Sequence, residues 1–322
     1  MSYIVTGGAG FIGSCIVKSL NERGINDIII VDDISNTEKW KNLTNKNFSF
    51  YINKRDFFSE LPKFQNDVTH VIHMGACSST TEKDFDYLWN NNVQFTQKLW
   101  SFCSEKHISF IYASSAATYG DGKEGFDDEK DISSLRPLNG YGYSKQLFDL
   151  WSRKEKETPS QHVGLKFFNV YGPNEYHKGT MASMVFHGFR QAVQKGQISL
   201  FNSYNPNFKD GKQLRDFIYV KDICKVILWL IDHPYVNGLF NLGTGVADSF
   251  YHMAQYTFEA LSMKENINII EMPEELRGKY QYFTEAKMTK LRKAGYKDHF
   301  YSLKEGVFDY VDNYLIKDFL IM

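Results

Sequence analysis

The chain has 322 residues, of which 43% are hydrophobic and 23% are charged, and its formal net charge is -1. These values are typical of a soluble globular protein with a large core, and the length favours about two domains. Lys and Arg (37) nearly balance Asp and Glu (38), so we expect no basic surface for nucleic acid or an anionic membrane. Small ligands or protein partners are expected instead.

Four cysteines are scattered along the chain, without a Cys-x-x-Cys pair and without histidines at metal-ligand spacing. We therefore expect reduced thiols and no metal site. The first residues, "SYIVTGGAGFIG", lack the basic start and cleavage site of a signal peptide, and no apolar run approaches the length of a membrane span. A cytoplasmic location is the corresponding expectation.

Short runs rich in β-branched residues alternate with segments of helical period. The expected strands lie at residues 3–7, 27–33, 47–53, 70–76, 109–115 and 163–172. Their Val and Ile residues are continuous instead of alternating with polar ones, as in parallel strands that helices cover on both faces. The sequence therefore predicts an α/β fold with a Rossmann-like, doubly wound parallel sheet.

The pattern changes after Pro173. Turn residues become more frequent, and the polar stretch "NSYNPNFKDGKQLRDF" (202–217) precedes a helical run, "DICKVILWLIDH", and a strand, "GLFNLG". This predicts a second, smaller α/β substrate domain, partly interleaved with the first. We assign residues 1–168 plus 217–243 to the dinucleotide-binding domain and residues 169–216 plus 244–322 to the substrate domain.

The octapeptide "TGGAGFIG" follows the first expected strand and opens the next helix. Gly7, Gly10 and Gly13 have the spacing G-x-x-G-x-x-G. Glycine is needed where the backbone turns sharply and where a side chain would collide with a pyrophosphate on the helix N-terminus. In this context of strand, loop and helix, the motif predicts a dinucleotide site.

Two acidic residues, Asp32 and Asp33, end the second expected strand about 20 residues after the glycines, where a carboxylate can accept hydrogen bonds from the adenosine ribose. Taken alone, they favour NAD. Lys39 follows in a loop that can reach a ribose 2′-phosphate, although it can equally be a solvated surface lysine. The residues alone leave NAD and NADP both open.

In "NGYGYSKQ" (139–146), a helix would place Tyr141 and Lys145 about 40° apart on one face and Tyr143 on the other side. Ser114 and Ser115 follow the fifth strand, at the sheet edge where ligands bind. We expect a neighbouring ammonium and a positive nicotinamide to lower the Tyr141 pKa toward the working range, with a serine hydroxyl holding the substrate oxygen. As alternatives, the serines can cap a helix and Tyr141 can be a half-buried aromatic residue.

Three motifs, "TGGAGFIG", "ASSAATYGD" and "YGYSK", resemble those of the extended short-chain dehydrogenase/reductase family of nucleotide-sugar enzymes, whose chemistry is hydride transfer assisted by Ser, Tyr and Lys. Further blocks along essentially the whole chain are similar to one branch of that family, the ADP-L-glycero-D-manno-heptose 6-epimerases. The specific blocks are "GACSSTTE" and "HKGTMAS", and "QLRDFIYVKD", "FNLGTG" and "GKYQYFTEA" also match. The resemblance implies an isomerase that inverts C6 of an ADP-linked heptose for a bacterial surface polysaccharide, with bound NADP and a homo-oligomeric assembly.

The resemblance also implies roles for individual residues. Tyr141 and Lys178 would be catalytic acid/base residues, supported by Lys145 and Ser115. The implied cofactor contacts, beside the three glycines, are Phe11, Ile12, Asp32, Asp33, Lys39, Lys54, Met74, Gly75, Ala76, Cys77, Ser78, Asn91, Lys145, Val170 and Lys178. The implied substrate contacts are Ser115, Asn169, Thr180, His187, Phe201, Asn202, Ser203, Tyr204, Arg215 and Tyr280.

Two positions depart from the pattern of the branch: Met74 stands where some members carry an acidic residue, and Thr180 where some carry Ser. The first removes a carboxylate but keeps backbone contacts, and the second keeps the hydroxyl. The segment before Arg215 is also longer than in short-loop members, which puts the equivalence of its residues in doubt.

Lys178 makes mechanistic sense as a second base. Inverting a carbinol without net oxidation requires hydride removal to give a ketone and hydride return to the ketone's opposite face. The hydroxyl proton then leaves and returns from different directions, which a single tyrosine serves poorly. Without the resemblance, Lys178 reads equally well as a solvated loop lysine.

Arg215 suits a diphosphate because its planar fork offers bidentate donors, although an Arg before Asp216 is more often a surface ion pair. Asn169 can be a turn residue, and His187 can be merely packed or solvated.

Two rival functions stay open. A nucleotide-sugar 4-epimerase or 4,6-dehydratase would share the glycine loop and Tyr141 with Lys145 but would not need Lys178. A nonenzymatic dinucleotide sensor would not need the catalytic set.

Overall fold

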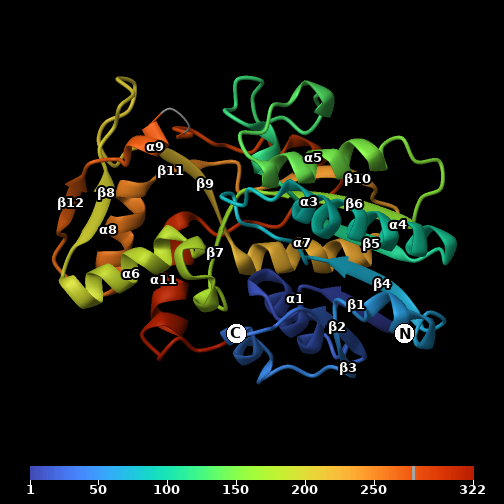
Figure 1. The fold of residues 1–322 in the computed structure, drawn as a ribbon. Coiled ribbons are helices and arrows are strands. Elements are labelled where there is room, and N and C mark those ends of the chain that lie inside the picture. The colour runs from blue at the N-terminus through green and yellow to red at the C-terminus, as the bar shows by residue number, and fades with distance from the viewer. Residues whose placement is uncertain (278–279) are drawn as a thin grey trace.

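The computed structural model describes residues 1–277 and 280–322. Its main sheet has seven parallel strands in the order β10-β6-β5-β4-β1-β2-β3 (Figure 1). The strands are β1 (Ser2–Thr6), β2 (Ile28–Asp32), β3 (Phe50–Asn53), β4 (Val68–His73), β5 (Ser109–Ser115), β6 (Gln161–Phe167) and β10 (Gly238–Leu242). Every residue of β1 and β2 is buried, which explains their continuous apolar sequences. The predicted doubly wound sheet is confirmed.

Helices cover both faces of this sheet, with α1 and α7 on one face and α3, α4 and α5 on the other (Figure 1). Their bounds are α1 (Phe11–Glu22), α2 (Phe57–Glu60), α3 (Phe85–Leu88), α4 (Phe95–Glu105), α5 (Gly140–Ser152) and α7 (Val220–Asp232). α7 shows why such segments form covering helices. Its buried residues Val220, Ile223, Ile227 and Leu230 recur every three or four positions and make one apolar stripe against the sheet.

The strand order reverses beside β1. The chain builds β1, β2 and β3 outward in one direction and then crosses back to place β4 on the other side of β1. In open α/β sheets, ligands bind outside the carboxyl ends of the strands at such a reversal. The loops after β1 and β4 are therefore the expected walls of a ligand site.

The remaining strands form two small sheets, which lie on the left in Figure 1 with the helices α6, α8 and α11. One has the order β11-β9-β7 and the other β12-β8. The bounds of these strands are β7 (Asn169–Tyr171), β8 (Ile198–Phe201), β9 (Leu214–Tyr219), β11 (Ala247–Ser249) and β12 (Ile267–Ile270). The helices of this region are α6 (Met184–Lys195), α8 (Phe250–Ala260), α9 (Glu274–Arg277) and α11 (Leu303–Tyr310). The short helix α10 (Thr289–Lys293) lies instead against β10 of the main sheet.

The single strand expected at residues 163–172 is two strands, and that expectation was wrong. The backbone N–H of Phe168 donates to the carbonyl of Leu242 at 3.1 Å, and the chain then leaves the main sheet. β7 pairs instead with β9. Val170 and the buried Tyr171 of β7 follow the buried residues of β6 closely in the sequence, so hydrophobicity alone does not mark the change of sheet.

We retain the division into two interleaved domains as a proposal. The change of sheet after residue 167 supports the first boundary, while the proposed boundary at residue 217 falls inside β9. Within residues 1–277 and 280–322, no helix is both long and apolar enough to cross a membrane. The same residues contain no cluster of three His, Cys, Asp or Glu side chains that could hold a metal ion.

Candidate active site

The glycine loop after β1 has a geometry that only glycine allows at two positions. Gly7 has a φ of +66°, and a Cβ on it would lie 2.7 Å from the backbone nitrogen of Gly75. A Cβ on Gly13 would lie 2.1 Å from the carbonyl oxygen of Gly7. Gly10 begins α1 without a side-chain cap, so the first backbone N–H groups of α1 are available to an anion. The loop therefore fits a dinucleotide pyrophosphate.

A cleft of about 420 Å³ extends from this loop. Its walls come from the loops after β1 and β4, the end of β5, the start of α5 and the turn Tyr176–Met181. The candidate residues that line it are Gly7, Gly10, Phe11, Ile12, Gly13, Asp32, Lys39, Met74, Gly75, Ala76, Cys77, Ser78, Tyr141, Lys145 and Lys178. A cavity of about 190 Å³ shares several of these residues and adds Asp33, Lys54 and Asn91. All the cofactor candidates except Val170 thus line one of these two spaces.

At the β2 end of this region, Asp32 is already satisfied by the protein. Its carboxylate accepts hydrogen bonds from the backbone nitrogens of Ala9 at 2.9 Å and Asp33 at 2.7 Å. It also pairs with the Lys39 ammonium at 2.7 Å. The Lys54 ammonium donates to the Asn91 side chain at 2.7 Å. Two ammonium groups therefore accompany the carboxylates at the place where an adenosine ribose would lie.

Tyr141 and Lys145 lie on the first turns of α5, whose start is fixed by an N-cap and a close backbone contact. The Asn139 side chain accepts the Gly142 backbone N–H at 2.8 Å as an N-cap, and a Cβ on Gly142 would lie 2.7 Å from the carbonyl oxygen of Ala117. This close approach brings α5 against the turn after β5. Tyr143 is 45% exposed, stacks on Phe85 and does not line the cleft, so the predicted choice of Tyr141 over Tyr143 agrees with the geometry.

The Lys145 ammonium is buried and donates to the carbonyl oxygen of Ala113 at 2.8 Å. Burial lowers the pKa of Lys145 to about 8, although the charges of Asp149 and Cys77 oppose that shift. The pKa of Tyr141 is raised, mainly by burial, while the Ser115 hydroxyl lowers it. Desolvation of the phenolate thus outweighs the other effects in the protein alone. The lowering expected from the ammonium together with a positive nicotinamide stays a prediction.

The two serines at the end of β5 have different surroundings. Ser114 is buried and donates to the Asp149 carboxylate at 2.7 Å. Ser115 caps the following turn, because its hydroxyl oxygen accepts the Ala117 N–H at 3.1 Å. Ser115 therefore caps this turn, as the alternative proposed. Its hydroxyl also lies beside the Tyr141 phenol.

Lys178 lies on the turn Tyr176–Met181 and lines the same cleft as Tyr141, which comes from α5. Burial lowers its pKa, and the charge of Glu175 raises it. The turn is tied to the glycine loop by Asn42, whose side-chain amide donates to the carbonyls of Ala9 at 3.0 Å and Asn174 at 3.1 Å. Lys178 is therefore held at the cleft by buried polar contacts, unlike a freely solvated loop lysine.

Part of the substrate set forms a second cluster outside the cleft. The Arg215 guanidinium lies over the ring of Tyr280 at 5.2 Å, and the Phe201 ring packs edge-on against Tyr280 at 6.4 Å. Arg215 is buried and is not paired with Asp216, whose carboxylate accepts backbone N–H groups of Thr244, Gly245 and Ala286. The surface ion pair considered as an alternative for Arg215 was wrong.

Neighbours of Phe201 complete this cluster. The Asn202 side chain accepts the Met272 N–H at 2.9 Å, the Ser203 N–H donates to Asp210 at 2.7 Å, and the Tyr204 N–H donates to the Tyr282 hydroxyl at 3.1 Å. The other substrate candidates are dispersed: Asn169 on β7, Thr180 on the turn with Lys178, and His187 on α6. The cofactor candidate Val170 also lies on β7. None of these four lines the 420 Å³ cleft. The first two residues of "GKYQYFTEA" (278–286) lie outside the described residues.

Sequence reasoning missed the buried Asn92. Its side chain accepts the Cys77 N–H at 2.9 Å and donates to the Cys77 carbonyl at 3.0 Å and the Ser144 hydroxyl at 3.0 Å. It joins the loop after β4 to α5, and it lies in a π-helical turn, Trp89–Gln94, of the kind often found at functional sites. The run "NNN" (90–92) inside a helical pattern was the available signal.

Comparisons with known proteins identify the family of the chain. Residues 3–243 match the family model described as the NAD dependent epimerase/dehydratase family. The chain is 51% identical over 326 residues to an ADP-L-glycero-D-manno-heptose-6-epimerase of Fusobacterium nucleatum, with 98% of each chain covered. Among solved structures, it is similar to the Helicobacter pylori ADP-L-glycero-D-manno-heptose-6-epimerase, with a TM-score of 0.79 and 27% identity over 97% of this chain and 95% of that chain.

The fold alone does not separate the branches of this family. A UDP-N-acetylglucosamine 4-epimerase from Methanobrevibacter ruminantium has a TM-score of 0.81 and 26% identity over 98% of each chain. Sequence identity separates them better, because the Fusobacterium relative is about twice as identical to this chain as either solved structure. From the matched model and this full-length similarity, the chain belongs to the NAD dependent epimerase/dehydratase family.

Proposed function

We propose that the protein inverts C6 of the heptose in ADP-D-glycero-β-D-manno-heptose to give ADP-L-glycero-β-D-manno-heptose, with NADP as its bound cofactor. The observation that carries the proposal is the presence of two separate acid/base candidates, Tyr141 and Lys178, on different walls of one cleft that begins at a dinucleotide loop. The name and the 51% identity of the Fusobacterium relative support the choice of substrate.

The dinucleotide supplies the acceptor and donor of the hydride that leaves and returns to C6. Tyr141 and Lys178 move the hydroxyl proton, one before and the other after the intermediate ketone turns its second face. The Ser115 hydroxyl, beside the Tyr141 phenol, holds the reacting oxygen. Lys145, four residues after Tyr141 on the same face of α5, has its ammonium fixed by the Ala113 carbonyl. A binding cluster of Phe201, Arg215 and Tyr280 receives the ADP end, where the guanidinium offers paired donors to a diphosphate.

We favour NADP over NAD because Asp32 is already engaged by Ala9, Asp33 and Lys39, which leaves its carboxylate poorly available to ribose hydroxyls. Lys39 and Lys54, at the same end of the site, offer the positive charge that a 2′-phosphate requires. NAD stays possible in this geometry. The cytoplasmic location and the homo-oligomeric assembly stay predictions.

The experiment is to add the purified protein to ADP-D-glycero-β-D-manno-heptose and follow the configuration at C6 by NMR. Inversion at C6 without added cofactor supports the proposal together with cofactor retention. The alternative is a 4-epimerase, favoured by the equally similar Methanobrevibacter structure. That alternative predicts no change at C6 and inversion at C4 of a UDP-hexosamine, which serves as the second substrate in the same assay.

A further inference from the structure

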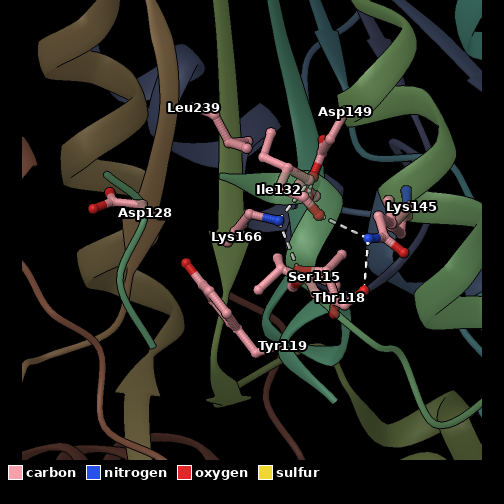
Figure 2. Close-up of polar contacts among 12 residues, drawn as sticks. Ser115, Thr118, Tyr119, Asp128, Ile132, Lys145, Asp149, Lys166 and Leu239 are labelled. Atoms are coloured by element: carbon pink, nitrogen blue, oxygen red, sulfur yellow. Dashed lines mark hydrogen bonds and ion pairs between the residues drawn. The ribbon is translucent and has the colours of Figure 1, made fainter. Parts of the chain in front are cut away.

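A fully buried ion pair lies behind the catalytic face of α5. The Lys166 ammonium on β6 is 2.8 Å from the Asp149 carboxylate on α5, and their side chains are 1% and 0% exposed (Figure 2). Burying two charges costs free energy that their mutual attraction often fails to recover, and a well-packed apolar pair would commonly be as stable. Stability alone is therefore a weak reason for this pair.

Asp149 connects α5 to the end of β5. It stands four residues after Lys145, one helical turn further along the same face. Its carboxylate accepts hydrogen bonds from the hydroxyls of Ser114 at 2.7 Å and Tyr112 at 3.2 Å. The Lys145 ammonium donates to Ala113, next to Ser114. Both charged residues of α5 thus fasten the helix to the strand end that carries Ser115.

Lys166 holds the turn that follows Ser115. Its ammonium donates to the Thr118 hydroxyl at 2.6 Å, and that hydroxyl donates to the carbonyl of Ser115 at 2.8 Å. Figure 2 shows Lys166 between Asp149 on one side and Thr118 on the other. The chain of contacts from Asp149 through Lys166 and Thr118 ends at the backbone of the serine that faces the Tyr141 phenol.

We infer that Asp149 and Lys166 are positioning residues for this active site: they hold Ser115 and Lys145 in place and balance the charge beside Tyr141. The kinetic part of the inference rests on the proposed epimerase function. The pair does not face the cleft, so it acts through Ser115, Lys145 and Tyr141 and not by contact with substrate.

The charged surroundings make this balance sensitive. The groups that face Tyr141 and Lys145 are Asp149 from α5, Cys77 from the loop after β4 and His73 from β4, and Lys178 lines the same cleft. Burial lowers the pKa of His73 to about 3, so this side chain is neutral at pH 7. Asp149 raises the pKa values of both Tyr141 and Lys145. The Lys166 ammonium offsets that influence because it pairs with the same carboxylate.

The two halves of the pair should therefore have opposite effects. In Lys166→Met, the uncompensated carboxylate stabilises the Lys145 cation and disfavours the Tyr141 phenolate, so both pKa values rise by about 1 unit. In Asp149→Asn, the uncompensated ammonium lowers both by a similar amount. The pH profile of kcat moves in the same two directions, kcat at pH 7.5 falls about tenfold or more, and the KM for the nucleotide sugar stays within about threefold.

The direct measurement is the pH titration of the Lys145 side-chain nitrogen by NMR in full-length protein labelled with ¹⁵N-lysine, assigned with Lys145→Arg. It needs no substrate, so it separates failure of this inference from failure of the proposed function, which the wild-type C6 assay tests. Lys166→Arg keeps the charge and should restore the wild-type titration. Lys221→Met removes a structural ion pair with Asp309 at 2.6 Å, away from the cleft, and should leave the Lys145 titration unchanged.

Either single variant leaves a buried charge unpaired and can fail to fold. The double variant Asp149→Asn with Lys166→Met carries neither charge, and thermal unfolding reports whether each variant is folded. If both single variants fold, the inference predicts that the Lys145 pKa of the double variant lies between their two values. If only Lys166→Met folds, the Lys145 pKa of the double variant should lie below that of Lys166→Met. The inference is overturned when the folded variants share the wild-type Lys145 titration, or when both single variants shift it in the same direction.

Discussion

The Lys39 ammonium lies 2.7 Å from the Asp32 carboxylate, at the end of the site where the adenosine ribose would lie. An Asp at the end of the second strand ordinarily favours NAD through the ribose hydroxyls. Here the cation neutralises that carboxylate, and its side chain, 19% exposed, lines the site, so it is placed to meet a 2′-phosphate as well.

Lys39→Ala is therefore expected to weaken NADP binding about tenfold, or about 1.4 kcal/mol, and NAD binding much less. Dissociation constants for both cofactors, measured by fluorescence titration of protein stripped of bound nucleotide, check this. The matched control is Lys41→Ala, which removes an exposed lysine of the same turn that pairs with Glu38. An equal loss for both cofactors in Lys39→Ala would argue that Lys39 only supports the loop.

Tyr141 and Lys178 stand on different walls of the cleft, and each is expected to be required for turnover. Tyr141→Phe and Lys178→Met should each lower kcat for C6 inversion by about 10²- to 10⁴-fold, because each removes one proton-transfer group. Bound cofactor, measured by absorbance after denaturation, should stay at the wild-type level. Tyr143→Phe is the control, since Tyr143 is exposed on the other side of α5. Wild-type-like inversion by both Tyr141→Phe and Lys178→Met would contradict the two-base assignment.

His73 gives a prediction about stability and pH. It is buried between the hydroxyls of Thr6 at 2.5 Å and Thr96 at 2.9 Å, and burial lowers its pKa from 6.5 to about 3. The unfolded chain binds this proton near pH 6.5 while the folded protein does not, so the contribution is fully present above pH 6.5 and is lost as the pH falls toward 3. By pH 5 the loss from this single group is about 2 kcal/mol of unfolding free energy.

Urea unfolding at pH 7 and pH 5 measures this loss. His73→Gln should be less stable than wild type at pH 7, but its stability should fall less between the two pH values, by about 2 kcal/mol. His299→Gln, which replaces an exposed histidine, should show the wild-type pH dependence. The same pH dependence in His73→Gln and wild type would mean that His73 takes up its proton in the folded protein as well.

The parts of the site that the sequence predicted are those set by local patterns. Gly7 and Gly13 follow from the need for backbone without a Cβ, and Tyr141 with Lys145 follows from the helical period. The main sheet follows in the same way from continuous Val and Ile runs. In each case a local pattern of residue types marks the turn, the helix face or the buried strand before its distant contacts are known.

The parts that escaped prediction depend on contacts between distant segments. The break between β6 and β7 follows from pairing with β10 and β9, which lie about 50 to 75 residues further along the chain. The raised pKa of Tyr141 comes from its burial by several elements, and a single ammonium on its own helix does not decide it. Asn92 and the pair Asp149–Lys166 look like ordinary polar residues until the fold buries them.

The turn that carries Lys178 is packed against residues 319–322. The Phe319 ring packs against the rings of Tyr176 at 5.4 Å and Phe186 at 5.9 Å. The Tyr176 hydroxyl donates to the Leu320 carbonyl at 3.0 Å, and the Met322 N–H donates to the Asn174 side chain at 2.9 Å. These contacts fix both ends of the segment that precedes Lys178.

Phe319→Ala should therefore loosen this turn more than it destabilises the whole protein. Hydrogen exchange of residues 174–181, followed by mass spectrometry, should quicken about tenfold, whereas exchange in α5 should stay unchanged, because the Phe319 ring packs on rings of the turn and α6. The rate of C6 inversion should fall by several-fold with KM little changed, since Lys178 spends less time in place. Phe50→Ala, at an exposed position on β3, is the control for loss of an aromatic ring. Unchanged exchange at residues 174–181 would show that the turn holds Lys178 by its own contacts with Asn42 and Glu175, and the rate of inversion would then stay at the wild-type value.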